Sequence, residues 1–291
     1  MKKMIWAFFL NLFFSVVELI GSFVTGSVAI ASDALHDFAD AITIGISCFL
    51  EKKSNRQPDE TYTYGYRRYS VLAGFSGSLV LLVGSAVVIY HAVGRIVNPQ
   101  PIHYNKMIFF GIFGIICNGV AAYITHGDES VNQKAVNLHM IEDVLGWVAV
   151  LLGAVVMKFT QFAIIDPLLS VGVAVFIIVN AGRNLKHSLE ILLEKAPAGI
   201  SASQVKDLLL TTDGVIDVHH MHLWSMDGIT NYATLHLVTN EHPDNIKKQV
   251  KAILSQKGIS HVTLELETSD EHCNERICAI APQKNCCHHH H

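Results

Sequence analysis

The chain has 291 residues, of which 51% are apolar and only 16% are charged, and its mean hydropathy is +0.36. Soluble domains carry about a quarter charged residues, so this composition argues against an ordinary soluble domain and against a disordered chain. With 21 Lys and Arg against 25 Asp and Glu, the net charge of −4 gives no sign of a nucleic-acid partner. The length suffices for several membrane spans and one small domain.

The charged residues are unevenly distributed along the chain. Residues 1–185 contain 24 of them, and the much shorter stretch 186–291 contains 22. We therefore expect a transmembrane domain over residues 1–185, a linker over 186–200, a soluble domain over 201–270 and a tail containing Cys and His over 271–291.

Six apolar stretches in the first domain are long enough to cross a bilayer, which takes about 20 residues in a helix. They are residues 4–24, 27–50, 69–91, 107–125, 135–159 and 162–181. The first could instead be a secretory signal, but Asn11 and Glu18 interrupt its apolar run and favour a retained helix. The sequence thus predicts an α-helical membrane protein with six transmembrane helices.

Lys and Arg residues near the ends of these stretches predict the orientation. Ten of them fall on one side of the membrane and three on the other, and the richer side is normally cytoplasmic. We therefore expect a multi-pass protein of the cell membrane, surrounded by lipid, with both termini in the cytoplasm.

Two of the predicted spans contain ionisable residues, which are costly in hydrocarbon and usually face the bundle interior. His36 and Asp40 stand four residues apart in the second span, and His139 and Asp143 repeat this spacing in the fifth. Residues four apart lie on one helix face, about 6 Å apart along the axis. If the two faces meet, they offer two imidazole nitrogens and two carboxylate oxygens.

This ligand set suits tetrahedral Zn²⁺, because imidazole favours Zn²⁺ over Mg²⁺ and Ca²⁺. The alternative is that the same residues form hydrogen bonds or ion pairs between helices. Asp33 and Asp37 lie off the face of His36, and we interpret them as supporting or entry groups rather than ligands.

Four motifs together resemble a known family. They are residues 26–40 (GSVAIASDALHDFAD), 64–68 (YGYRR) and 137–143 (NLHMIED), and the pair Asp166-Pro167. With these motifs the chain resembles the cation diffusion facilitator family, on its zinc-transporting, cadmium–zinc–cobalt resistance-type branch. The resemblance covers essentially the whole chain, including the soluble domain.

The resemblance implies a homodimeric, proton-coupled exporter of divalent metal, with Zn²⁺ preferred and Cd²⁺ or Co²⁺ as further candidates. The family's central site falls here on His36, Asp40, His139 and Asp143. Some bacterial members carry a second site with His residues just before the third span. Here residues 62–66 read YTYGY, without His or Cys, so we do not expect that site.

The soluble domain shows a different periodicity from the spans. A helix is expected over residues 201–211, strands over 215–224 and 232–238, a helix over 245–256 and a strand over 261–267. The order αββαβ fits a small two-layer α/β domain of metallochaperone-like shape, which the resemblance also implies for the cytoplasmic side.

Relatives bind additional metal in this domain. Carried over to this sequence, the candidate ligands are His219, His236, His261 and Glu267, with the register of the last strand open by one residue. The alternative is that these strand histidines face solvent or satisfy a hydrogen bond in the core.

The cysteines give weaker indications. Cys48 and Cys117 lie in spans and are interpreted as packed thiols. Cys273 and Cys278 resemble a cysteine pair that some relatives carry near this end. Two interpretations of the tail stay open: it captures a soft metal, or it is a flexible segment with reduced thiols. Residues 288–291 are all His and are either native or a tag remnant, so no inference uses them.

We predict a secondary active transporter rather than an enzyme. The sequence contains no Gly-x₄-Gly-Lys-Ser/Thr motif for a nucleotide, so the energy must come from an ion gradient. A histidine must be deprotonated to bind metal, which makes the site a metal–proton exchanger. The rivals are a membrane-tethered zinc sensor or scaffold, and a membrane metalloenzyme, which would need an open coordination position.

Overall fold

The computed structural model describes residues 2–125 and 131–270. The chain divides into two compact units. The first comprises the chain up to Arg56 together with Leu72–Lys186, and the second comprises Gln57–Val71 together with the chain from His187 onward. The loop before the third long helix therefore groups with the C-terminal unit.

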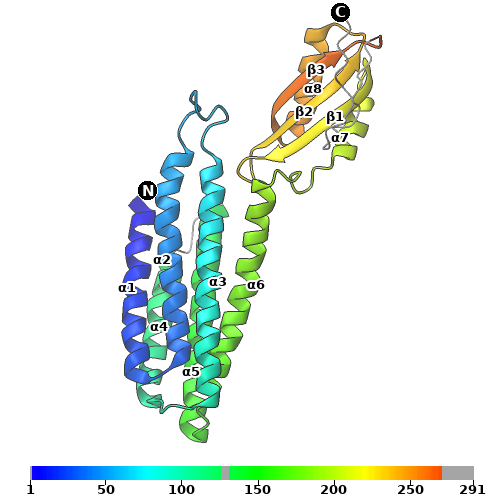
Figure 1. Ribbon diagram of the computed structural model, residues 1–291. Coiled ribbons are helices and arrows are strands. Elements are labelled where there is room, and N and C mark those ends of the chain that lie inside the picture. Colours follow the sequence, from blue (N-terminus) through cyan, green and yellow to red (C-terminus); the bar gives the residue numbers. More distant parts are fainter. Residues whose placement is uncertain (1, 126–130, 271–291) are drawn as a thin grey trace, which may run out of the picture. The chain divides into compact units, whose positions relative to one another are not determined.

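Long helices make up the described part of the first unit, as Figure 1 shows. They are α1 (Lys2–Thr25), α2 (Val28–Ser54), α3 (Arg68–Val97), α4 (Tyr104–Thr125), α5 (Val131–Thr160) and α6 (Ile165–Leu192). Helix α1 packs along α2, α4 packs along α5, and α1 also meets α4. Each expected span thus has a helix at its position.

Three helical segments of the described residues are long and apolar enough to cross a membrane. They are Arg68–Val97, Asp143–Thr160 and Ile165–Leu192, and shorter apolar stretches occupy Asn11–Thr25 and Tyr104–Val120. The helical membrane architecture is as predicted, whereas the number of six spans stays a prediction.

The second unit is a two-layer α/β domain in the predicted order αββαβ. Its elements are α7 (Ala202–Leu210), β1 (Val215–Ser225), β2 (Asn231–Thr239), α8 (Pro243–Gln256) and β3 (Ile259–Glu267). Strand β2 lies in the centre of the sheet, antiparallel to β1 and parallel to β3. A parallel neighbour needs a crossover, and α8 supplies it.

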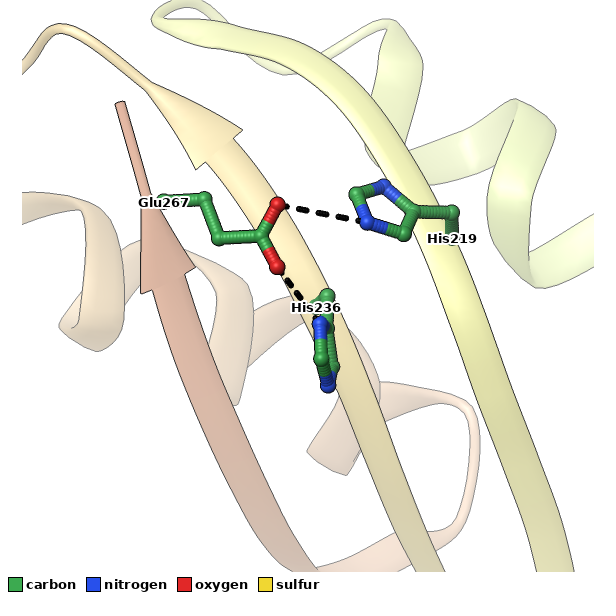
Figure 2. A group of neighbouring side chains, drawn as sticks. All are labelled: His219, His236 and Glu267. Carbon is green, nitrogen blue, oxygen red and sulfur yellow. Dashed lines mark hydrogen bonds and ion pairs between the residues drawn. The ribbon is translucent and has the colours of Figure 1, made fainter. Parts of the chain in front are cut away.

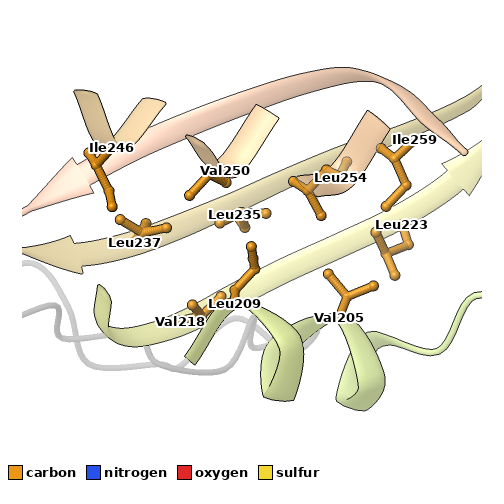
Figure 3. Packing of buried hydrophobic residues seen from close by; sticks show 11 residues of the cluster. Val205, Leu209, Val218, Leu223, Leu235, Leu237, Ile246, Val250, Leu254 and Ile259 are labelled. Atoms are coloured by element: carbon orange, nitrogen blue, oxygen red, sulfur yellow. The ribbon is translucent and has the colours of Figure 1, made fainter. Parts of the chain in front are cut away.

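One hydrophobic core holds the two layers of this domain together (Figure 3). Leu235 and Leu237 of β2 are buried against Leu209 of α7 and Val250 of α8. Side chains alternate along a strand, so the residues between them point to the face away from both helices. His236 lies on that outer face, which also carries the candidate ligands.

The loop before α3 is attached to the C-terminal domain by polar and aromatic contacts. Arg67 Nη1 donates hydrogen bonds to Asp227 Oδ2 at 3.1 Å and to Thr230 Oγ1 at 2.5 Å. The ring of Tyr64 makes edge contacts with Trp224 and Tyr232. The loop thereby belongs to the domain although its sequence lies between two membrane helices.

Asp227 is held in its ionised form. Partial burial alone would raise the pKa of Asp227, but hydrogen bonds from the backbone N–H groups of Thr230 and Ile229 and from Arg67 bring it below its usual value. The contact with Arg67 is therefore present at neutral pH and is lost only in acid, as the pH falls through this lowered pKa.

Replacing Arg67 by Ala is expected to loosen the loop without unfolding the domain. An exposed ion pair contributes up to about 1 kcal/mol, so amide hydrogen exchange in residues 57–67 should accelerate about two- to fivefold at neutral pH. Exchange measured by mass spectrometry checks this, with Lys251→Ala on the exposed surface of α8 as the control for charge loss. An unchanged rate in Arg67→Ala would contradict the attachment.

Candidate metal centres

His36 and Asp40 lie together on one face of α2. The distance between His36 Nε2 and Asp40 Oδ2 is 3.7 Å, and the two side chains are 19% and 16% exposed. The spacing of one helical turn produces this approach, as expected from the sequence. The face therefore presents an imidazole nitrogen and a carboxylate oxygen side by side.

Asp143 of α5 acts on the same region of α2. Its charge interacts with Asp33 and Asp37, and Asp33 in turn interacts with His36 and Asp40. His139, the remaining predicted ligand, lies on α5, but its side chain is outside the described residues. The structure thus brings Asp143 to the part of α2 that carries Asp33 and Asp37, the two carboxylates beside the pair of His36 and Asp40.

Glu18 of α1 is a neighbour of this region that the sequence did not single out as a site residue. It is 4% exposed, and its carboxyl group interacts with Asp33 and Asp37. The available signal was a carboxylate within an apolar span, which usually faces the interior of a bundle. Its place beside α2 depends on how α1 packs, and a single sequence does not specify that packing.

A second cluster lies on the outer face of the C-terminal sheet (Figure 2). Glu267 Oε1 is 2.6 Å from His236 Nδ1, and Glu267 Oε2 is 3.2 Å from His219 Nε2. One ligand atom from each of the three residues lies within 4.8 Å of the other two. His219 and His236 are opposite each other in the β1–β2 pairing, so the sheet itself sets their separation.

Several polar atoms of this cluster are buried without a hydrogen bond. The ring nitrogens of His219 and Glu267 Oε2 have no partner in hydrogen-bond geometry, although Nε2 and Oε2 lie 3.2 Å apart and the two side chains are only 6% and 11% exposed. Buried polar atoms in proteins nearly always have partners. A cation held between imidazole nitrogens and a carboxylate oxygen would satisfy them, and this donor set suits Zn²⁺.

Asp217 adds negative charge beside His219. Partial burial raises the pKa of Asp217, but the backbone N–H of Val218 and the ammonium of Lys206 lower it more, and the net shift is downward. Asp217 is therefore ionised at neutral pH. Its Oδ2 lies 3.5 Å from His219 Nδ1, while Nε2 of the same ring lies 3.2 Å from Glu267 Oε2.

His261 does not join this cluster. It lies opposite Tyr232 in the β2–β3 pairing, four residues before the position of His236, which is about 13 Å along the strand. Glu265 occupies the position opposite His236 instead, and its Oε2 is 3.2 Å from His236 Nε2. The structure thus does not bring the predicted fourth ligand, His261, to the cluster, because the pairing between parallel strands is set across the α8 crossover.

The predicted pair of cysteines in the tail, Cys273 and Cys278, lies outside the described residues. The two candidate metal centres described above consist of His, Asp and Glu side chains.

Comparison with known proteins identifies the family. Residues 4–193 match the model of the cation efflux transmembrane domain, and residues 197–269 match that of the cation efflux protein, cytoplasmic domain. The chain belongs to the cation efflux family. This membership confirms the resemblance predicted from the span motifs, and it makes the protein a membrane transporter whose C-terminal domain is cytoplasmic.

Curated relatives cover almost the whole chain. A zinc transporter, ZitB, of Yersinia pseudotuberculosis is 34% identical over 100% of this chain and 95% of its own. A cadmium, cobalt and zinc/H(+)-K(+) antiporter of Bacillus subtilis is 30% identical over 100% of this chain and 96% of its own. The metal cation efflux system protein CzcD of Cupriavidus metallidurans is 29% identical over 87% and 82% of the two chains.

Proposed function

We propose that this cation efflux protein exports Zn²⁺ from the cytoplasm in exchange for protons. Its transport site consists of His36 and Asp40 on α2 with His139 and Asp143 on α5. The observation that carries the proposal is the approach of His36 Nε2 to within 3.7 Å of Asp40 Oδ2 on one face of α2, with Asp143 of α5 near the neighbouring Asp33 and Asp37.

The chemistry of the ligands provides the exchange. A histidine must lose its proton before the nitrogen can bind a metal, so zinc arriving from the cytoplasm displaces protons from His36 and His139. Protons entering from the other side compete for the same nitrogens and release the zinc. The bundle needs to expose the site to the two sides in turn, which requires two conformations of similar free energy.

The names of the relatives support the same reading. The Yersinia protein is named a zinc transporter, and the Bacillus protein is named as an antiporter of cadmium, cobalt and zinc against protons and potassium. Cd²⁺ and Co²⁺ are accordingly secondary cargo candidates here. The ligands themselves favour Zn²⁺, which prefers a tetrahedral set of nitrogen and oxygen donors.

We propose that the chain spans the membrane six times and that its N-terminus, like its C-terminal domain, lies in the cytoplasm. We also propose that the protein works as a homodimer, as the family resemblance implies. Within the cytoplasmic domain, His219, His236 and Glu267 form a regulatory zinc site, and Glu265 replaces His261 as the fourth candidate.

The second candidate function is a membrane-tethered zinc sensor or scaffold, and the cytoplasmic cluster is the observation that favours it. Zinc entry into sealed proteoliposomes distinguishes the two functions. A transporter carries zinc across the bilayer to a fluorescent indicator inside. A sensor binds zinc tightly but leaves the internal signal at the level of protein-free vesicles.

A further inference from the structure

Asp166 is a buried carboxylate of α6 that the proposed zinc site does not use. It is 1% exposed, and it caps the first turn of another helix, α2. Its Oδ2 accepts a hydrogen bond from the backbone N–H of Val28 at 2.7 Å. Its Oδ1 accepts from the Ser27 hydroxyl at 2.5 Å and from the N–H of Ala29 at 3.3 Å. The first N–H groups of a helix have no partner within it, so α6 supplies the bonds that α2 lacks.

The turn between α1 and α2 is held from two further sides. Arg95 of α3 donates a hydrogen bond to the carbonyl oxygen of Gly26 at 3.2 Å, and the N–H of His103 donates to the carbonyl oxygen of Thr25 at 2.8 Å. Gly26 has a φ of +74°, and a Cβ there would lie 2.8 Å from the carbonyl oxygen of Pro101. The turn is therefore closely packed. We call Asp166, Arg95 and residues 26–29 the outer clasp.

The outer clasp lies on the exit side of the proposed transport site. The C-terminal domain that follows α6 is cytoplasmic, so the start of α6 with Asp166 is at the opposite, non-cytoplasmic end. His36 follows Val28 by two helical turns, which is about 12 Å along the axis. Ser27 is 2% and Val28 7% exposed, so the first turn of α2 is buried at this end of the bundle.

The clasp also joins helices that are far apart in the sequence. Asp166 lies on α6 and Arg95 on α3, and both bond the turn at which α2 begins. Hydrogen bonds to an ionised group are about twice as strong as those between neutral groups. The bonds of Asp166 and Arg95 thus link α6 and α3 to α2 at this end.

We infer that Asp166 is a positioning residue that keeps the non-cytoplasmic end closed by capping α2, and that this cap separates in every cycle when zinc leaves. The inference rests on the proposed export function, because only a transporter has to open this end. Zinc released from His36 and Asp40 toward the exit passes the first turns of α2. The N–H groups of Val28 and Ala29 then lose the Asp166 carboxylate and become accessible to water.

Amide hydrogen exchange in proteoliposomes reports this separation on the unmodified protein. A zinc gradient drives turnover while the pH is the same on both sides, so the intrinsic exchange rates do not change. We expect exchange in residues 27–30 to accelerate at least tenfold during turnover. The Asp40→Asn variant, whose transport site is disabled, should show no acceleration with zinc. Unchanged exchange in the wild-type protein while zinc flux proceeds would overturn the inference.

Variants of the cap provide an independent test. Asp166→Asn loses the negative charge and one acceptor, so we expect fast exchange in residues 27–30 with or without zinc and a transport rate at least tenfold lower. Zinc affinity should stay within twofold of the wild-type value, which a collapsed bundle would not allow. The matched control is Ser170→Ala, since the Ser170 hydroxyl donates to the backbone oxygen of Asp166 in the same helix and not to the cap of α2 among the described residues.

The outcomes separate this inference from the proposed function. If both the wild-type protein and Asp166→Asn transport zinc at the same rate, the role of Asp166 is contradicted while the export function stands. Equal losses of zinc binding and of transport in that variant would show a general structural role, and they also contradict the inference. Absence of zinc flux in the wild-type protein contradicts the export function itself.

Discussion

Zinc transport by the Asp40→Asn variant is expected to fall by at least about 100-fold, with the protein still folded. Replacing residues that merely support metal ligands costs 10- to 100-fold in metal affinity, so the loss of a ligand should cost at least as much. Asn keeps the size of the side chain and one carbonyl oxygen, but it removes the negative charge next to His36 Nε2. Zinc flux into proteoliposomes with equal amounts of protein measures the effect.

Two further variants make this test specific. His36→Gln should show a loss of similar size, because it removes the other member of the pair on α2. Asp207→Asn makes the same chemical change at an exposed position on α7 and should transport like the wild-type protein. Wild-type flux in Asp40→Asn would show that the pair on α2 does not carry the metal.

The second large effect is expected in the cytoplasmic domain. Replacing His219 and His236 together by Ala should weaken zinc binding there by at least about 100-fold, since two of the three clustered ligands are lost. Calorimetric zinc titration of the full chain measures this, with Asp40→Asn in the background so that the transport site does not contribute.

His261→Ala is the matched control for this titration. The residue lies on the same strand as Glu267 and faces the same side of the sheet, but it pairs with Tyr232 rather than joining the cluster. We expect the zinc affinity of the His261→Ala variant to equal that of the background protein. The zinc affinity of Glu265→Gln should fall to an intermediate value. A loss in His261→Ala as large as in the double variant would contradict the ligand set seen in Figure 2.

Local periodicity predicted most of the fold and half of the transport site. The spacing of His36 and Asp40 is a property of one helix, and the structure has the two side chains together. The pattern of residues 232–238 likewise predicted a strand, and the structure has β2 there with Leu235 and Leu237 in the core. Such patterns depend only on neighbours along the chain.

The features that the sequence left open depend on contacts between distant segments. Glu265 rather than His261 lies beside His236, because the register between parallel strands is set across a helix. A bulge between His219 and His222 shifts the following residues of β1 against β2. The Asp-Pro motif at the start of α6 marked a position of interest, but the role of Asp166 as the cap of α2 required the packing of two helices far apart in the sequence.

The measurement that tests the central claim most directly is uphill zinc uptake driven by an imposed pH gradient. Proteoliposomes with the cytoplasmic domain outside and an acidic interior are given equal zinc on both sides. The proposed exchange predicts that zinc accumulates inside as protons leave, and that a protonophore abolishes the accumulation. Zinc that only equilibrates, with the same rate whether or not the gradient is present, would contradict the metal–proton exchange.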